Sequence, residues 1–247
     1  MFSGLTVANI IGIPLGTYVG HNISWRYTFM IVVAVGIITV LAILFWLPKI
    51  EKNTPIPIKD ALKIFKRAEL WLILGITSIG TGGFFAWYSY ITPLLTEVSN
   101  FDDGMVIFIL MLAGLGMTFG NVLGGKLADK FSPIKATAIL LSVMTLCLIT
   151  IYFIAPMQWM MLIMVFVTGA FAFSTAPSIQ MLMIKSAKES EMLASSVNQA
   201  AFNVANALGA FLGGLPIAAG YGYTSPELVG AILALCGVGL SSSLIVP

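Results

Sequence analysis

The sequence predicts an all-helical membrane protein, and three observations lead to this fold class. The chain has 247 residues, of which 59% are apolar and 9% are charged, whereas soluble domains are about 25% charged. The apolar residues form continuous runs of about 20, the length of a helix that crosses a bilayer. The basic residues fall almost entirely in every second connection between these runs. A water-soluble globule and a β-barrel, whose strands alternate in polarity, are both excluded.

Each apolar run must be a helix, because lipid offers no water to an open strand edge. We expect about eight spans, near residues 3–20, 28–47, 70–95, 105–125, 136–155, 159–184, 192–218 and 227–246. In the third span, Gly80, Gly82, Gly83 and Pro93 predict a bend or a break in the helix.

The charges predict the topology. Eleven of the 12 Lys and Arg residues lie in the connections 48–69, 126–135 and 185–191. The other connections contain Arg26 as their one basic residue, together with three acidic residues. Because basic connections stay on the cytoplasmic side, both ends of the chain are expected there too.

Several classes of function are excluded by what the sequence lacks. A net charge of +2 with dispersed basic residues does not provide the basic surface that nucleic acid requires. Cys147 and Cys236 stand alone in apolar runs, so neither a disulfide nor a metal site is expected. Paired carboxylates, His clusters and a nucleophile with a base are missing. We therefore expect no enzyme activity, no cofactor and no bound metal.

Three stretches carry a family resemblance. The first contains Gly12, Pro14, Gly16, Gly20 and Arg26 within residues 4–29 and resembles the antiporter motif of bacterial exporters. The second, Gly125-Lys-Leu-Ala-Asp129-Lys130, resembles a signature loop between two helices, and residues 198–209 are similar to helix eleven of the same exporters. The family is the drug and sugar exporter branch of the major facilitator superfamily, and within it the chain resembles the arabinose-inducible permeases.

The resemblance implies a partial transporter fold that corresponds to helices five to twelve of the family. Residues 1–47 would be the last two helices of an N-terminal bundle, 48–69 a cytoplasmic amphipathic linker, and 70–247 a six-helix C-terminal bundle. It also implies a monomer in the bacterial inner membrane that exports a small solute by alternating access, with protons as the coupling ion. The middle of every span lacks Asp and Glu, so we expect the proton carrier to precede Met1.

Two stripes of glycine recur at four-residue spacing, which allows close helix packing in lipid. They are Gly12, Gly16 and Gly20 in the first span, and Gly116, Gly120 and Gly124 in the fourth. One interpretation is ordinary packing. The other, which the resemblance implies, is that the two stripes face each other across the boundary between the transporter halves.

Asp129 lies in the signature loop with Gly125 and Lys130. The resemblance implies that its carboxylate docks on the positive N-terminal end of the first span and holds the cytoplasmic gate shut. The alternative is a solvated carboxylate in a connection.

Polar and aromatic side chains inside the spans are candidates for binding the solute, because they tend to face a wet cavity. The set comprises Gln199, Asn203 and Asn206 on one face of the seventh span, Gln180 in the sixth, Asn121 in the fourth, and Trp87, Tyr88 and Tyr90 in the third. The alternatives are hydrogen bonds between helices for the amides and an interfacial belt for the rings. Uncharged amides favour a neutral polar solute over an ion.

The competing function is a non-transporting membrane scaffold or a partner-binding subunit. In a scaffold, helix contacts would use up the whole amide face of the seventh span. In a transporter, that face would border a gap that water can reach.

Overall fold

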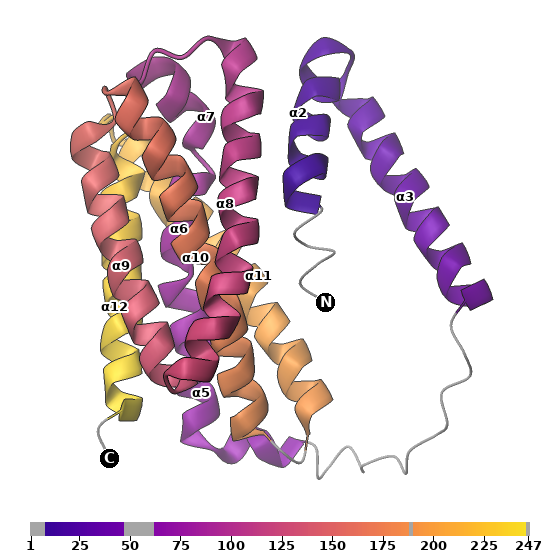
Figure 1. Ribbon diagram of the computed structural model, residues 1–247, viewed down its shortest axis with the longest axis vertical. Coiled ribbons are helices and arrows are strands. Elements are labelled where there is room, and N and C mark those ends of the chain that lie inside the picture. Colours follow the sequence, from indigo (N-terminus) through magenta and orange to yellow (C-terminus); the bar gives the residue numbers. More distant parts are fainter. Residues whose placement is uncertain (1–7, 47–61, 188–189, 246–247) are drawn as a thin grey trace.

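The computed structural model describes residues 8–46, 62–187 and 190–245, and all the regular structure in these ranges is helical (Figure 1). The elements are η1 (Ala8–Gly12), α2 (Ile13–Asn22), α3 (Trp25–Trp46), η2 (Leu62–Lys66), α5 (Ala68–Gly75), η3 (Ile76–Gly80), α6 (Gly82–Tyr88), α7 (Ile91–Pro93), η4 (Leu94–Val98), α8 (Asp103–Lys130), α9 (Pro133–Ile154), α10 (Gln158–Ser186), α11 (Glu191–Ala218) and α12 (Ser225–Ile245).

Seven helices of the described residues are long and apolar enough to cross a membrane. They are α3, the continuous unit Ala68–Tyr88, and each of α8 to α12. The all-helical membrane class is therefore confirmed. The first expected span, 3–20, extends into residues 1–7, which lie outside the described part, and its remainder forms η1 and α2.

The connections lie at two ends of the bundle (Figure 1), and their sequences give these ends opposite charge. One end, called here the basic end, contains the start of α5, the α8–α9 turn and the connection from α10 to α11, which include Arg67, Lys130 and Lys185. The other, the acidic end, contains the segment between η4 and α8 with Asp102 and Asp103. In α8, Asp103 lies in the first turn and Lys130 in the last, where each charge complements the helix dipole.

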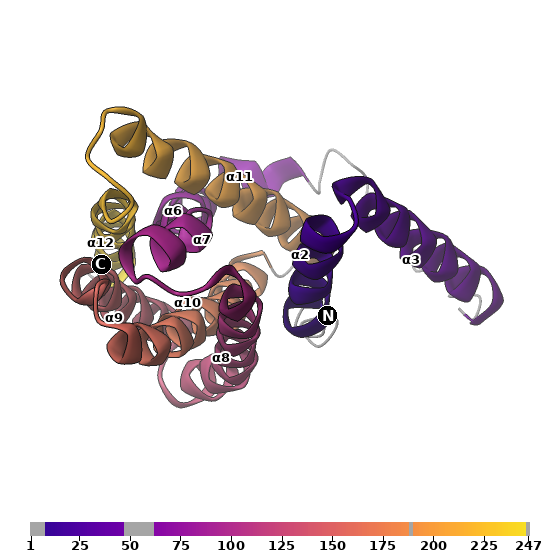
Figure 2. The same ribbon diagram turned by 90° about the horizontal axis from the view of Figure 1, so that it is seen from above.

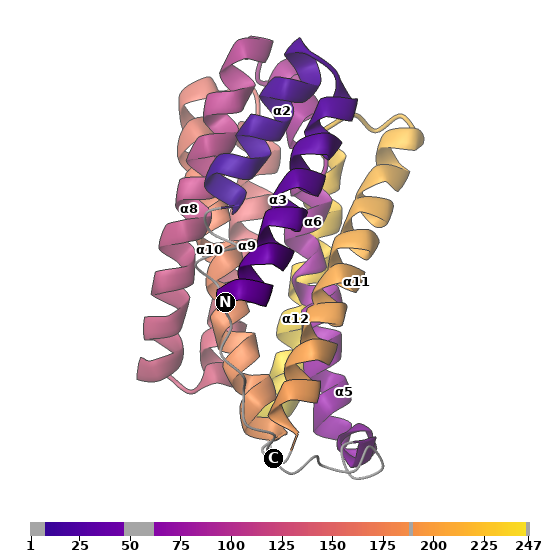
Figure 3. The ribbon, with the colours of Figure 1, turned by 90° about the vertical axis from the view of Figure 1, so that its right-hand side faces the viewer.

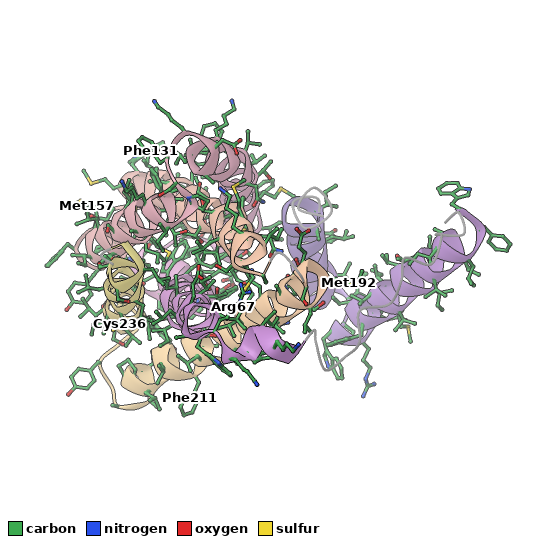
Figure 4. All side chains as sticks on the ribbon, turned by 90° about the horizontal axis from the view of Figure 1, so that it is seen from below. Arg67, Phe131, Met157, Met192, Phe211 and Cys236 are labelled. Atoms are coloured by element: carbon green, nitrogen blue, oxygen red, sulfur yellow. The ribbon has the colours of Figure 1, made fainter. Side chains whose placement is uncertain are left out.

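Helices α5 to α12 form one bundle, and α2 with α3 forms a hairpin beside it (Figure 2). The bundle surrounds an apolar core that includes the fully buried Trp87, Ile109 and Leu148. The hairpin joins the bundle where η1 and α2 pack on α8 (Figure 3). Helix α3 packs on α2 and has no buried residue, so its apolar side chains project on all sides (Figure 4).

The expectation that the two glycine stripes face each other is wrong. Gly116, Gly120 and Gly124 pack against the backbone of α10, where an added Cβ would overlap the carbonyl oxygens of Phe166, Ala170 and Ser174 respectively. In the hairpin, Gly16 and Gly20 face Thr28 of α3, while nothing lies within 4 Å of the Cβ position of Gly12. Both stripes thus mediate ordinary packing. The reason is that α10 also has small residues on the face turned toward α8, so the backbones of α8 and α10 pack closely along the stripe.

The third expected span is broken, as its glycines and proline predict. A π-helical segment, η3, separates α5 from α6, and α6 ends at Tyr88, before a turn at Ser89 and Tyr90. The short helices α7 and η4 continue toward α8. Of the expected amphipathic linker, 48–69, the structure describes only the last part, which includes the 3₁₀ helix η2. Residues 47–61 lie outside the described part.

At the basic end, the start of α5 is tied to the end of α10. Arg67, labelled in Figure 4, donates from Nη1 to the carbonyl oxygen of Ser186 at 2.9 Å. The Ser186 hydroxyl in turn donates to the Glu69 carboxylate. These bonds hold the two helices together at the edge of the bundle.

Candidate functional site

A cavity of about 260 Å³ lies between the third span, α10 and α11. Its lining is Thr81, Phe84, Phe85, Ala172, Phe173, Thr175, Ala176, Gln199, Phe202, Asn203 and Asn206. No side chain in this lining is charged. The cavity therefore offers a neutral, partly apolar surface.

The amides of α11 form the polar wall of the cavity. Gln199, Asn203 and Asn206 recur at steps of four and three residues, which places them on one helix face, and all three are exposed to the open space. The Asn203 amide nitrogen donates to the carbonyl oxygen of Gln199 at 3.1 Å. The structure thus brings together three of the eight residues that the sequence suggested for solute binding.

Two threonines add acceptors to the same cavity. Thr81 donates its hydroxyl proton to the Thr77 carbonyl at 2.6 Å, and Thr175 donates to the Ala172 carbonyl at 2.6 Å. A hydroxyl whose proton is engaged still offers its lone pairs. Pro177 lies inside α10 and has no N–H, so it provides no helical donor for the carbonyl of Phe173, four residues earlier.

The apolar wall centres on Phe84. Its ring meets the rings of Phe85 at 5.3 Å and Phe173 at 5.6 Å, both edge to face. It also stacks on Tyr88 at 5.0 Å and meets Trp87 edge to face at 5.8 Å. Phe84 therefore connects the cavity with the aromatic cluster at the end of α6.

Gln180 has a different environment from the three amides of the cavity. Its Nε2 donates to the Ser195 hydroxyl at 2.7 Å, and its Oε1 accepts from Asn198 Nδ2 at 2.8 Å. Asn198 is fully buried, and its Oδ1 accepts from the Thr77 hydroxyl at 3.0 Å. This hydrogen-bonded network, called here the amide network, joins η3, α10 and α11 next to the cavity, on its side toward the basic end. We therefore leave Gln180 out of the solute-binding set proposed below.

The remaining candidates from the third and fourth spans do not line the cavity. Trp87 is fully buried in the bundle core, which is not the position of an interfacial belt residue. Tyr88 is partly buried against Phe84, and the Tyr90 hydroxyl donates to the Ala210 carbonyl at 2.8 Å. Asn121 lies on α8, outside the lining.

The comparison with known families decides the identity of the fold. A family model described as "Major Facilitator Superfamily" matches residues 1–192. The chain belongs to the major facilitator superfamily.

Relatives within this superfamily match almost the whole chain. The AraJ protein of Escherichia coli (strain K12) is 35% identical over 96% of the chain and 60% of its own length. The "Inner membrane transport protein YdhP" of the same strain is 39% identical over 95% and 60%. The "Probable sugar efflux transporter" of Helicobacter pylori (strain ATCC 700392 / 26695) is 28% identical over 94% and 59%. The resemblance stated from the sequence is confirmed, and the chain spans about 60% of the length of these relatives.

The motif residues of the superfamily lie away from the cavity. Asp129 is exposed near the end of α8, next to Lys130, whose ammonium lies 5.6 Å from the ring centre of Phe131. Gly125 precedes them on α8, with nothing within 4 Å of its Cβ position. Pro14 lies in the first turn of α2, and Arg26 is exposed in the first turn of α3 with its guanidinium 5.5 Å from the Trp25 ring.

Several residues of the site were not found from the sequence. Phe84, Phe85, Phe173 and Phe202 line the cavity, but in an apolar span a phenylalanine that faces a cavity has the same sequence context as one that faces lipid. Phe202 could have been predicted to line the cavity, because it lies three residues after Gln199 and shares its helix face.

Proposed function

We propose that this chain forms part of a secondary active transporter that exports a small uncharged solute, either a sugar or a drug-like molecule, by alternating access. The cavity is the observation that supports this proposal best, because it combines the amides of α11 with four phenylalanine rings. Amides bind hydroxyl and carbonyl groups, and the rings cover apolar surface. A charged solute would find no partner there and would lose its hydration.

The wider arrangement follows from the same proposal. Residues 1–47 would belong to an N-terminal bundle, 48–69 to a cytoplasmic linker and 70–247 to the C-terminal bundle. The basic end and both chain ends would face the cytoplasm, with the protein in the inner membrane as a monomer and protons as the coupling ion. A relative is named as a sugar efflux transporter, which supports including sugars among the solutes to be tested.

The scaffold is the alternative, and the amide face of α11 distinguishes it. A scaffold predicts that neighbouring helices cover this face. The exposure of Gln199, Asn203 and Asn206 to the cavity favours the transporter.

Cysteine labelling of the cavity tests the choice. In full-length protein carrying Cys236→Ser, which removes the exposed cysteine of the chain, we expect Asn203→Cys to react with a membrane-impermeant maleimide. Water that fills the cavity brings the reagent to this position in one of the two access states. The reaction rate is measured on intact cells and on inverted vesicles.

A buried position on the same helix is the control, because it would be labelled only if the helix unfolded locally. Ala205 is fully buried, so Ala205→Cys is expected to stay unlabelled in both preparations. Persistent protection of position 203 from both sides would support the scaffold. Accumulation assays with a panel of sugars and neutral drug-like dyes then identify the solute.

Asp129 gives a separate prediction for the cytoplasmic gate. If its carboxylate docks on the N-terminal end of the first span, the interaction contributes about 0.3 to 1 kcal/mol. We then expect Asp129→Asn and Asp129→Ala to change the transport rate by up to about fivefold. Asp103→Asn, an exposed acid at the other end of α8, is the control. Wild-type rates in both Asp129 variants would rule out the gating role.

A further inference from the structure

The acidic end of the bundle contains a buried carboxyl group that the proposed function has not used. Glu227 lies in the first turn of α12 and is 1% exposed. Its Oε2 atom has no hydrogen-bond partner within the described residues. From the sequence alone this residue is inconspicuous, because it begins the last expected span instead of lying in the middle of it.

Helix geometry places Trp87 of α6 on the face turned toward Glu227. Helices α6 and α12 run in opposite directions and meet at Gly83 and Gly230, where a Cβ on either glycine would overlap the carbonyl oxygen of the other. Trp87 is four residues after Gly83, and Glu227 is three residues before Gly230. Helix geometry therefore places both side chains on the contacting faces, one turn nearer the acidic end. Trp87 is fully buried, and its Nε1 donor also has no partner in the described part of the chain.

In the described helices that pack on α12, no basic group lies at the end where Glu227 is buried. The elements that pack on α12 are α5, η3, α6, α9 and α11, and the one Lys, Arg or His within them is Lys135, in the first turn of α9 at the basic end. The titratable side chains in their halves toward the acidic end are Tyr88, Cys147 and Tyr152. A negative charge on Glu227 would thus have no counter-ion from these helices.

We propose that Glu227 is a proton-binding site that exchanges its proton with water at the acidic end. On release, the O–H bond of the carboxylic acid breaks, its electron pair stays on the oxygen, and the proton passes to water. The carboxylate that remains inside the bundle requires a hydrogen-bond donor. The unpaired N–H of Trp87 is the donor that the facing helix supplies, so proton exchange makes and breaks a bond between α12 and α6.

The position of Trp87 connects this site with the cavity. Trp87 meets the ring of Phe84, which forms part of the cavity wall. Helix α6 carries both side chains and is bounded by the π-helical η3 and by the turn at Ser89 and Tyr90, so it has the breaks that a short helix needs to shift as a unit. This link rests on the proposed function, whereas proton binding by Glu227 does not.

Infrared spectra of the full-length protein in lipid nanodiscs test the proton site without any solute. We expect the pH-difference spectrum to lose one carboxylic acid band in Glu227→Gln. Glu97→Gln, which removes an exposed acid at the same end, is expected to keep that band. A spectrum in which Glu227→Gln and wild type show the same bands would overturn the proposal. Trp87→Phe keeps the carboxyl and removes the donor, so it should shift the pH at which the band titrates; an unchanged midpoint would overturn the pairing.

Transport assays in proteoliposomes separate this proposal from the function itself. The probe is the solute from the panel above that the wild type moves. We expect Glu227→Gln to keep downhill exchange and to lose accumulation driven by a pH gradient, while Glu97→Gln keeps both. Equal accumulation by wild type and Glu227→Gln would overturn the coupling role. If the wild type moves no solute, the proposed function fails, and the infrared spectra still decide whether Glu227 binds a proton.

Discussion

Replacing Gly120 by alanine is expected to destabilise the bundle more than any other single methyl group added to α8. The new Cβ would overlap the carbonyl oxygen of Ala170 on α10. Backbone atoms cannot rotate away as a side chain can, so the two helices must separate. The Ser174 hydroxyl lies 2.8 Å from the carbonyl oxygens of both Gly120 and Ala170, so the separation would leave it only the acceptor within α10. We expect a loss of about 3 kcal/mol, measured as a lower unfolding temperature of the purified protein in detergent.

Gly125 supplies the matched control on the same helix. Nothing lies within 4 Å of its Cβ position, so Gly125→Ala adds a methyl group without a clash. Alanine has a higher helix propensity than glycine by up to about 1 kcal/mol, so this variant should unfold at the wild-type temperature or slightly above. Equal unfolding temperatures for Gly120→Ala and wild type would show that α8 and α10 do not pack as described.

Replacing Asn198 by leucine is expected to have a similarly large effect through the amide network. Leucine removes the donor to Gln180 Oε1 and one of the two acceptors near the Thr77 hydroxyl, which keeps the Ile73 carbonyl oxygen at 2.9 Å. Asn198 and Thr77 are both fully buried, so water cannot easily replace the lost partners. An unsatisfied buried polar group costs about 1 to 3 kcal/mol, and we expect a loss of this size because the Gln180 amide oxygen loses its donor.

A double-mutant cycle identifies the origin of this loss. If the bond between Asn198 and Gln180 is the cause, then adding Gln180→Leu to Asn198→Leu should cost less than Gln180→Leu alone. Ser196→Ala is the control, since Ser196 is exposed and donates to Met192 within its own helix, so it should change stability by less than about 0.5 kcal/mol. Strictly additive effects of the two leucine variants would contradict the network.

The membrane-spanning helices could be predicted from the sequence because lipid imposes a strict rule on the backbone. A run of about 20 apolar residues must satisfy its own hydrogen bonds, so hydropathy alone finds α8 to α12. In contrast, the sequence does not predict which helix packs against which. The stripe of Gly116, Gly120 and Gly124 looks the same whether it faces α10 or α2, because every face of these helices is apolar enough for lipid.

The candidate site was predictable in part for a similar reason. The four- and three-residue steps of Gln199, Asn203 and Asn206 specify a common helix face, and the cavity lies on that face. Gln180 is also an amide in a span, but the register of α10 against α11 places it beside Ser195 and outside the cavity lining. That register depends on tertiary packing, so it cannot be predicted from the residue type of Gln180 or from its spacing in the sequence.

Helix α3 has one further consequence for how the two parts of the molecule can move. The hairpin meets the bundle through η1 and α2 against α8, while α3 is almost entirely apolar after Arg26 and has no buried residue. When the apolar surface of α3 moves, it exchanges one apolar contact for another, and the free energy changes little. If the two parts reorient as proposed, then substitutions where η1 and α2 meet α8, the contact between hairpin and bundle in the described part of the chain, should change the rate of reorientation more than the preferred orientation.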